Sequence, residues 1–474
     1  MSCCCPAMWW SGGQVPCFDA GMKQAFQLDD IAIAGGGPAG TLAAILLARA
    51  GYRVGLATSL PVHERMEGLS PRVVSILRAH ELPLAAIAPA SQRHARWGNF
   101  EGDQNVEHLV ERRAFDLGLL DRARQEGVSV TEGSIAAVLP ERGVIRMTDG
   151  RRILAGLLFE ARGRRAPRAV TGRARGALVG PETISIAGMV PSSGGRHGSE
   201  IAARPEGWTW RARMGEGRDW LQVVGDAAVV ARARGAAARR DMLWQQVLGT
   251  SEPAPHRARI SAASLRLTAP EFDPHCPRLG DAAVALDPLS GHGLFWAVSS
   301  ALMAVPVARA LFGGQVGLAR DFYRDRVVDT FWRQARIGRD FHAAAGQDGA
   351  FWQKRCQWPD ARPAHPDLDA PRLETRVLLR DGALSRGEVL VTRDDPGGAA
   401  FVLGQEIAPL LRALGPRPLP DAETFHRTFL PGQPAPLARR LHGWMLSRGL
   451  GRGAAVLSQE FEQENASCET KQAV

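Results

Sequence analysis

Residues 30–51 read DIAIAGGGPAGTLAAILLARAG, and this stretch decides the fold. Its short apolar run around Ile31 and Ile33 predicts a β-strand, the next six residues predict a glycine turn, and the stretch from Thr41 to Ala50 predicts a helix. Strand, glycine turn and helix N-terminus in this order are typical of a site for a dinucleotide pyrophosphate. The alternative is a glycine-rich turn in an unrelated strand–helix unit.

The turn contains the residues predicted to contact the dinucleotide, which are Gly35, Gly37, Pro38, Ala39 and Gly40. Gly35 permits the tight turn, Gly37 lets backbone N–H groups approach the phosphates, and Gly40 lets the helix pack closely on the strand. The free N–H groups and the helix dipole then hold the anion. The second predicted strand, 52–58, ends at Thr58, where an acidic residue usually binds the ribose. Thr58 is therefore predicted as a weaker cofactor contact.

Composition narrows the class of protein. The chain of 474 residues has 45% hydrophobic and 23% charged residues, which is ordinary for a globular protein with a sizeable core. No window approaches about 18–20 uninterrupted apolar residues, and residues 1–27 lack the pattern of a secretory signal. We therefore expect a disordered leader over 1–27, no membrane association and a cytoplasmic protein. The seven cysteines form no pair of CxxC motifs, so no metal site is predicted.

The charge is positive but dispersed. The formal net charge is +9, yet only Lys23, Lys354 and Lys471 are lysines, and the arginines are spread along the whole chain. Because no dense basic run occurs, nucleic acid is not the expected partner. The dispersed positive charge could instead favour an acidic protein partner.

The order of elements predicts an α/β fold built on a Rossmann-like dinucleotide-binding domain. Two strand-like runs, 207–214 and 219–225, flank a glycine turn and predict a hairpin in an inserted, mainly antiparallel substrate sheet. A hairpin-like pair followed by helical stretches at 401–414, 421–429 and 437–448 predicts a C-terminal α+β module that resembles a winged helix. The expected units are a core at 28–345 with the sheet inserted at roughly 170–265, a linker at 346–370, the module at 371–455 and a tail at 456–474.

Four motifs occur in a defined order: GGGPAG at 35–40, RRAFDLGLL at 112–120, FEARGRRAPR at 159–168 and GDAAVALDPLSGHGLFWA at 280–297. Together they resemble FAD-dependent monooxygenases of the aromatic-hydroxylase type and, more closely, the flavin-dependent halogenase-like branch. The resemblance implies FAD as the cofactor and Asp281 as the residue that binds its ribityl chain. It also implies cofactor contacts by Arg113, Gly291, Gly293 and Leu294.

The same resemblance implies that Pro288, Gly291 and His292 lie beside the reactive flavin ring as catalytic residues. Backbone N–H groups at the glycines could stabilise negative charge on the reduced ring. His292 could donate a hydrogen bond to a flavin peroxide or to the substrate. A histidine that merely faces the pocket is the alternative.

The resemblance implies transfer of an electrophilic oxygen from a flavin C4a-hydroperoxide, and for halogenases also a lysine and a WxWxIP motif in the substrate tunnel. This chain has no lysine between Lys23 and Lys354, and arginine follows Trp208-Thr209-Trp210, so hydroxylation is favoured. Trp208 and Trp210 share one side of a predicted strand and are expected to line the substrate pocket. Two packed tryptophans in a structural hairpin are the alternative.

The C-terminal module favours a large substrate, because an enzyme that acts on a residue inside another protein needs a docking surface. The chain looks like the flavoproteins that hydroxylate a peptidyl tryptophan on the way to cysteine tryptophylquinone in quinohemoprotein amine dehydrogenase. This similarity implies a protein or peptide substrate together with O2. A hydroxylase or halogenase of a free aromatic metabolite and a nucleic-acid-modifying flavoprotein are the alternatives. No second glycine motif is evident, so the expected reductant is transiently bound NAD(P)H or reduced flavin from a partner.

Overall fold

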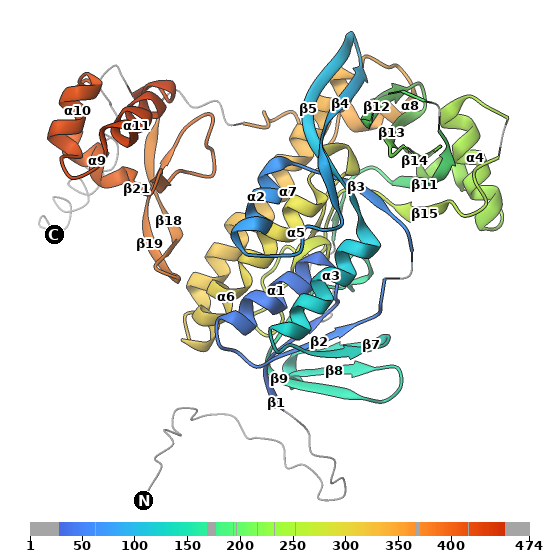
Figure 1. Cartoon of the computed structure of the whole chain (residues 1–474), viewed down its shortest axis with the longest axis horizontal. Coiled ribbons are helices and arrows are strands. Elements are labelled where there is room, and N and C mark those ends of the chain that lie inside the picture. Colours follow the sequence, from blue (N-terminus) through green and yellow to red (C-terminus); the bar gives the residue numbers. More distant parts are fainter. Residues whose placement is uncertain are drawn as a thin grey trace, which may run out of the picture.

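The computed structural model describes residues 28–450 apart from 62, 168–176, 193, 196, 216, 232, 252, 366–369 and 416. The predicted leader at 1–27 and the tail at 456–474 lie outside the described residues, as does part of the predicted linker. The described chain has a mixed α/β fold, as predicted, and its C-terminal hairpin and helices lie at one side of the core (Figure 1).

The N-terminal sheet grows from the opening motif. Strand β1 pairs in parallel with β2, where Ile31 lies opposite Val54, and on its other side with β9. Ile31 and Ile33 are fully buried, because a central parallel strand is covered on both faces. The sheet order is β6-β2-β1-β9-β8-β7, in which β8 and β7 are added by antiparallel pairing. Its strands are β1 (Leu28–Ala34), β2 (Val54–Thr58), β6 (Ser129–Glu132), β7 (Ile135–Leu139), β8 (Val144–Met147) and β9 (Arg152–Glu160).

Helix α1 is buried along most of its length and packs against α3, α5 and α6. Helices α5 and α6 form an apolar stretch, Gly293–Phe312, with a mean hydropathy of 1.6, which is long and apolar enough to cross a membrane. We interpret it as part of the core, because 61% of its most apolar window is buried inside the fold. Ser299, Ser300 and Arg309 interrupt this stretch, so it differs from the uninterrupted apolar run that the sequence analysis considered. The core helices are α1 (Pro38–Arg49), α2 (Pro71–Ala79), α3 (Arg112–Gln125), α5 (Gly293–Leu302), α6 (Ala304–Phe312) and α7 (Val316–Ala344).

The second sheet has the order β15-β11-β14-β13-β12-β4-β5-β3 and is larger than predicted. It was expected at roughly 170–265, but 66–111 contributes three of its strands. The long β4–β5 hairpin joins the sheet where β4 pairs in parallel with β12, with Arg93 opposite Ser199 (Figure 1). The strands are β3 (Met66–Leu69), β4 (Ile87–Trp97), β5 (Phe100–Glu111), β11 (Thr183–Pro191), β12 (Gly198–Arg204), β13 (Gly207–Arg213), β14 (Arg218–Asp226) and β15 (Arg259–Ala262).

Both faces of the second sheet are covered. Helix α4 (Ala236–Leu248) packs on one face through Leu243 and Val247. Helix α8 (Ala350–Cys356) packs on the other, inner face, so part of the predicted linker is helical. The predicted hairpin is confirmed as β13 and β14. A small sheet formed by β10 (Leu178–Val179), β16 (Arg266–Leu267) and β17 (Val284–Ala285) accompanies the two large ones.

The C-terminal unit places a hairpin before three helices. Helix was expected from residue 401, but two short strands come first and the helix starts at Ile407, which corrects that boundary. The unit has its own core and also contacts the core helices: Arg309 donates a 2.9 Å hydrogen bond to the Gly382 carbonyl, and Arg386 pairs with Asp321 at 2.7 Å. Its elements are β18 (Arg372–Arg380), β19 (Ala383–Val391), β20 (Phe401–Val402), β21 (Gln405–Glu406), α9 (Ile407–Leu414), α10 (Ala422–Phe429) and α11 (Ala435–Ser447).

Candidate active site

The glycine turn joins β1 to α1, and its glycines have different surroundings. Gly35 has φ +113°, and a side chain on it would overlap the Ala161 carbonyl. A side chain on Gly40 would overlap the Gly35 carbonyl. Gly37 has no atom within 4 Å of the place where a Cβ would lie, and it starts α1 without a side-chain cap. The N-terminus of α1 therefore presents open space and N–H groups that have no intrahelical partner.

Thr58 ends β2, as predicted, but its hydroxyl is already engaged. It accepts a 3.1 Å hydrogen bond from the Gly36 N–H and donates a 3.0 Å hydrogen bond to the Ser59 carbonyl. The residue is only 2% exposed. Thr58 thus holds the glycine turn in shape, and its contact with a ribose stays a prediction.

Asp281 lies next to the start of α1, although the two are far apart in the sequence. Gly280 adopts φ +55°, and a Cβ on it would come within 2.7 Å of the Ala39 side chain. The chain forms a 3₁₀ turn here rather than the end of a strand, and the Gly280 N–H donates a 2.8 Å hydrogen bond to Ser300. Arg164 Nε lies 3.6 Å from the Asp281 carboxylate. Burial raises the pKa of Asp281, and Arg164 opposes that rise.

Of the two arginines at the start of α3, Arg112 and not Arg113 points towards the acidic residues of the candidate site. Arg112 donates hydrogen bonds to Glu67 at 2.6 Å and to Asp116 at 3.1 and 3.0 Å, and its charge, like that of Arg164, opposes the rise in the pKa of Asp281 that burial causes. Arg113 is exposed. Consecutive residues of a helix point about 100° apart, so only one of the two can face the site. Arg113 thus points away from the acidic residues that Arg112 binds, and its contact with the cofactor stays a prediction.

The 288–293 loop follows β17 and leads into α5. Asp287 shapes it by accepting a 2.9 Å hydrogen bond from the Leu289 N–H. Gly291 adopts φ +62°, and both Gly291 and Gly293 are exposed. Because α5 starts at Gly293 without a side-chain cap, a second helix N-terminus presents its N–H groups here.

The other predicted residues of this loop have mixed surroundings. Pro288 is half-buried. His292 is exposed, and its pKa is lowered by desolvation among the surrounding side chains and by the charges of Arg333 and Arg93. Its imidazole is therefore neutral near pH 7 and can donate or accept a hydrogen bond. Leu294 is 3% exposed and packs in the core, so it can offer a ligand only its backbone.

A polar spot that the sequence analysis missed lies beside this loop, on the inner face of the second sheet. A Cβ on Gly291 would lie 3.4 Å from Arg93 Nη1, which is 4.0 Å from Glu107 Oε2. The Ser199 hydroxyl donates a hydrogen bond to the other Glu107 oxygen. Glu107 is only 7% exposed. The available signal was its position two residues before the buried Leu109, on the same face of one strand.

Trp208 and Trp210 lie on this inner face too, but they are packed. They are 1% and 7% exposed and form one cluster with Leu289 of the loop and Trp352 of α8. The expectation that they line an open pocket is corrected, and the packed-hairpin alternative describes them better. They form an apolar wall next to the polar spot.

The chain is similar to known flavin-dependent enzymes. No protein-family model matches the chain. A tryptophan 2-halogenase of Chondromyces crocatus is 26% identical, over 71% of this chain and 71% of the relative. The solved structure of peptidyl tryptophan dihydroxylase QhpG, essential for tryptophylquinone cofactor biogenesis, is 35% identical with a TM-score of 0.71, and the match covers 89% of this chain and 100% of that chain. This chain belongs to the flavin-dependent halogenase-like family.

This flavoprotein is accordingly an FAD-dependent oxidoreductase, as predicted. The structure of CmlS, a flavin-dependent halogenase, is 17% identical with a TM-score of 0.66, covers 91% of this chain and 98% of that chain, and supports the fold alone. The described residues fit FAD. Uncapped N-termini of α1 and α5 offer N–H groups for the pyrophosphate and the ring, Gly37 leaves room, and Asp281 can accept hydrogen bonds from hydroxyl groups.

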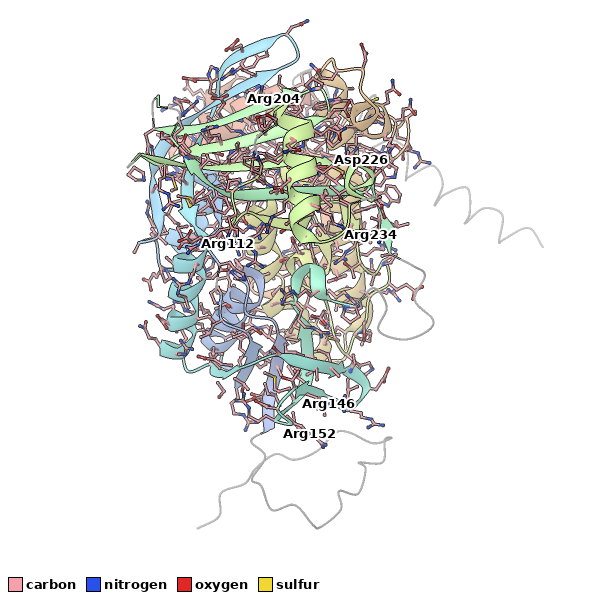
Figure 2. The ribbon with its side chains drawn as sticks, turned by 90° about the vertical axis from the view of Figure 1, so that its right-hand side faces the viewer. Arg112, Arg146, Arg152, Arg204, Asp226 and Arg234 are labelled. Atoms are coloured by element: carbon pink, nitrogen blue, oxygen red, sulfur yellow. The ribbon has the colours of Figure 1, made fainter. Side chains whose placement is uncertain are left out.

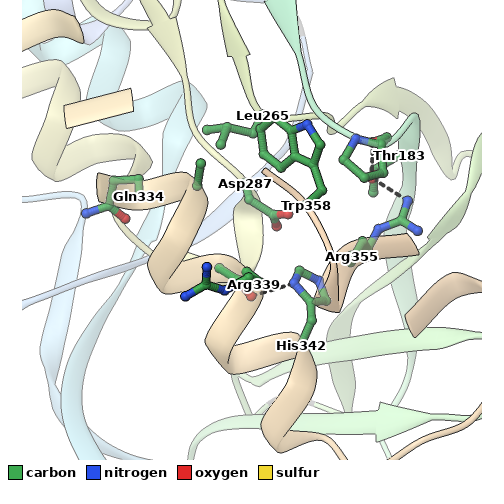
Figure 3. Close-up of a pocket in the computed structure, with 11 residues that line it drawn as sticks. Thr183, Leu265, Asp287, Gln334, Arg339, His342, Arg355 and Trp358 are labelled. Carbon is green, nitrogen blue, oxygen red and sulfur yellow. Dashed lines mark hydrogen bonds between the residues drawn. The ribbon is translucent and has the colours of Figure 1, made fainter. Parts of the chain in front are cut away.

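A small internal cavity of about 20 Å³ lies behind the loop, between α7, α8 and the second sheet (Figure 3). Three side chains that line it carry a buried polar atom without a described partner: Gln334 Oε1, His342 Nε2 and Arg355 Nε. Asp287 lines the same cavity. The volume is sufficient for one water molecule, which would connect Asp287 of the loop to α7 and α8.

His342 makes the stability of this flavoprotein depend on pH. Its Nδ1–H donates a 2.7 Å hydrogen bond to the Gly338 carbonyl. Burial lowers its pKa, the Asp287 carboxylate opposes that shift and Arg355 adds to it. Below about pH 6.5 the unfolded chain takes up a proton on this residue and the folded chain does not. Stability should therefore fall as the pH drops through 6.5 towards the lower pKa of the folded state.

The variant His342→Phe should lose less free energy of unfolding than the wild type between about pH 7 and 5. The difference should be about 1.4 kcal/mol for each unit by which the folded state lowers the pKa. Phenylalanine suits the site, because His342 already packs against aromatic rings. The centroid of its ring lies 6.0 Å from that of Phe351 and 5.8 Å from that of Trp352. Urea unfolding at both pH values measures the effect. Equal losses in the variant and the wild type would contradict it.

Proposed function

We propose that this protein hydroxylates an electron-rich aromatic ring, and that the ring belongs to a tryptophan held in a polypeptide. The observation that carries the proposal is the similarity to peptidyl tryptophan dihydroxylase QhpG, at 35% identity over 89% of this chain. The core at 28–345 makes up only about two thirds of the chain, so the similarity extends beyond it into the C-terminal unit. A polypeptide substrate gives that unit a role as a docking surface.

The chain's own residues bind and orient the cofactor. Bound and reduced, FAD supplies the activation of O2 and the electrophilic oxygen. N–H groups at the start of α1 hold the pyrophosphate, and Asp281 accepts hydrogen bonds from hydroxyl groups of the sugar chain. N–H groups at Gly291 and Gly293 would bind at the ring of the flavin, where they would favour negative charge. Arg112 fixes the acidic side chains around Asp281.

We assign Glu107 to the orientation of the substrate. Ser199 holds one of its oxygens, and the other lies near Arg93 beside the 288–293 loop, where it can accept a hydrogen bond from an indole N–H. The packed tryptophans next to it keep water away from an electrophilic oxygen. The neutral His292 can take up the proton that a ring carbon loses when it is oxygenated.

The charges favour hydroxylation over halogenation. The resemblance to halogenases implies a lysine in the substrate tunnel for the relay of hypohalous acid. The described part of the chain contains one lysine, Lys354 of α8. Its ammonium nitrogen lies 3.1 Å from a carboxylate oxygen of Asp226. No described lysine is therefore available to the loop.

Glu107→Gln should lower the turnover rate about tenfold and leave FAD affinity unchanged, because glutamine keeps the shape but loses the charge-assisted hydrogen bond. Substrate-dependent oxygen consumption and FAD titration measure the two quantities. Glu101→Gln is the matched control on the same hairpin, since the Glu101 side chain is 70% exposed, and it should behave as the wild type. An unchanged turnover rate in Glu107→Gln would refute the assignment.

Fractionation of a host-cell extract tests the class of substrate. The reduced, FAD-loaded protein should consume oxygen faster when the macromolecular fraction is added, and protease treatment of that fraction should remove the effect. Stimulation by the dialysable fraction alone would instead support a free aromatic metabolite. Stimulation that nuclease removes would support nucleic acid.

A further inference from the structure

A basic recess of about 310 Å³ lies at the free edge of the second sheet. Figure 2 faces this side of the molecule, with α4 in front of the sheet. The recess combines a helix residue with the segment that leads into β15, and its lining is Arg240, His256, Arg257, Ala258, Arg259 and Ile260. Three arginines and a histidine thus surround two apolar residues.

Among the described residues, the arginines of the recess form no ion pair with an acidic side chain. On the nearby strand β13, Arg213 pairs with Glu200 at 2.6 Å. By contrast, no described carboxylate forms an ion pair with Arg240, Arg257 or Arg259, and Arg240 Nε is buried without a described hydrogen-bond partner. Carboxylate groups of a ligand would satisfy these donors, because they match the fork of an arginine side chain.

The recess is bounded by an unpaired strand edge. β15 pairs with β11 on one side and is the last strand of the sheet on the other. Arg259, Ser261 and Ala262 of this strand are exposed. Charged residues on an edge strand often protect it against aggregation. Arg240 lies on α4 and not on the strand, so this protective role does not explain it. A free edge can accept an extended peptide as an additional strand.

The strand that borders the recess continues towards the active site. Directly after β15, the Ala263 N–H donates a 2.8 Å hydrogen bond to the Thr183 carbonyl, and Leu265 then lines the cavity behind the 288–293 loop. Thr183 lines the same cavity. A few residues of chain thus connect the recess to the loop.

We propose that this recess docks an acidic, extended segment of a polypeptide, which adds as a strand to the free edge of β15. Carboxylates pair with Arg240, Arg257 and Arg259, while the backbone of the segment pairs with the strand edge. Nucleic acid suits the recess less well, because its backbone has no matching N–H groups and the lining has no phenyl or indole ring on which bases could stack. Docking of an acidic segment does not depend on the proposed hydroxylation. Only the identification of the docked polypeptide as the substrate rests on the proposed function.

Fluorescence anisotropy of a labelled hexaglutamate peptide tests the docking on the full chain, without reductant or turnover. The triple variant Arg240→Glu, Arg257→Glu, Arg259→Glu should raise the dissociation constant at least about tenfold. The matched control is Arg142→Glu, Arg146→Glu, Arg152→Glu, which makes the same change of net charge on exposed arginines. Arg146 and Arg152 lie far below α4 in Figure 2, so the control should change the constant less than about threefold. Circular dichroism and FAD titration verify that both variants are folded.

A hexaglutamate methylated at every amide nitrogen separates strand addition from charge alone. It should bind at least about fivefold more weakly, because methylation removes the donors that pair with a strand edge. The proposal is overturned if hexaglutamate does not bind, if both triple variants lose affinity equally, or if the methylated peptide binds equally well. Equally tight binding of a six-nucleotide oligothymidylate would overturn it too. Since no reaction takes place in this assay, such a failure is distinct from a failure of the proposed hydroxylation.

Discussion

Gly40→Ala should destabilise the protein by about 3 kcal/mol or more, because the added methyl group would overlap the Gly35 carbonyl and lie 2.9 Å from the Ala161 side chain. The turn cannot move away easily, since α1 is held by α3, α5 and α6. Urea unfolding of the protein without added FAD measures the loss. A Gly40→Ala protein as stable as the wild type would contradict the packing described for the turn.

Gly37→Ala is the matched variant at the same turn, since a Cβ there meets no atom within 4 Å. Its stability should change by less than about 1 kcal/mol, as expected for an exchange at a helix N-cap without a side-chain hydrogen bond. Added FAD should stabilise it less than the wild type, because the methyl group fills the space through which the pyrophosphate approaches the N–H groups.

Asp281→Leu should raise the dissociation constant of FAD at least about a hundredfold. The change removes the acceptor for the sugar-chain hydroxyls and leaves Arg164 without its carboxylate. The fold should persist, because Arg164 keeps hydrogen bonds to the Ser264 and Leu286 carbonyls at 2.6 and 2.8 Å. Fluorescence titration with FAD measures the affinity, and circular dichroism verifies the fold.

Two further variants serve as an intermediate case and a control for the effect of Asp281→Leu on FAD binding. Asp281→Asn keeps the shape and one acceptor oxygen, so it should weaken FAD binding only about tenfold. Asp121→Leu replaces an aspartate of α3 whose side chain is 67% exposed, and it should bind FAD as the wild type does. Undiminished binding by Asp281→Leu would show that the ribityl chain is held elsewhere.

The fold could be predicted where it depends on local pattern. The strand–turn–helix at residues 28–49 and the β13–β14 hairpin carry apolar periodicity and turn residues in adjacent positions. The β4–β5 hairpin carries many charged residues, and its place in the sheet depends on pairing with β12, far along the chain. Such non-local pairing leaves no periodic signal, so the sequence places the second sheet too late and makes it too small.

The candidate site, like the fold, could be predicted from the sequence only in part. Asp281 belongs to a contiguous motif, and the fold brings its neighbour Gly280 next to Ala39 of α1, whereas its contact with the ribityl chain stays a prediction. Thr58 could be read only as a replacement for an acid, because its hydrogen bond with the Gly36 N–H exists only once the turn has folded. A sequence motif predicts which residue lies at the site. The hydrogen-bond partner of its side chain is set only by the folded structure.

Residues that were missed, or whose surroundings differ from those expected, have a geometric cause in common. Arg112 and Arg113 are adjacent, and only the direction of each on α3 shows which one binds Glu67 and Asp116. Glu107 acquires Ser199 and Arg93 as neighbours through strand pairing, so the only nearby sign in the sequence is its alternation with the buried Leu109. A charged residue in phase with buried positions of a strand is the signal to look for.

The central claim is that FAD held by this chain delivers oxygen to an aromatic ring in a polypeptide, and isotope labelling tests it most directly. The FAD-loaded protein is reduced and mixed under ¹⁸O₂ with polypeptides from host cells that lack it. Mass spectrometry of the digested polypeptides should find heavy oxygen on a tryptophan, and Asp281→Leu should abolish the label. Heavy oxygen found only in hydrogen peroxide and water, or only in a small metabolite, would contradict the claim.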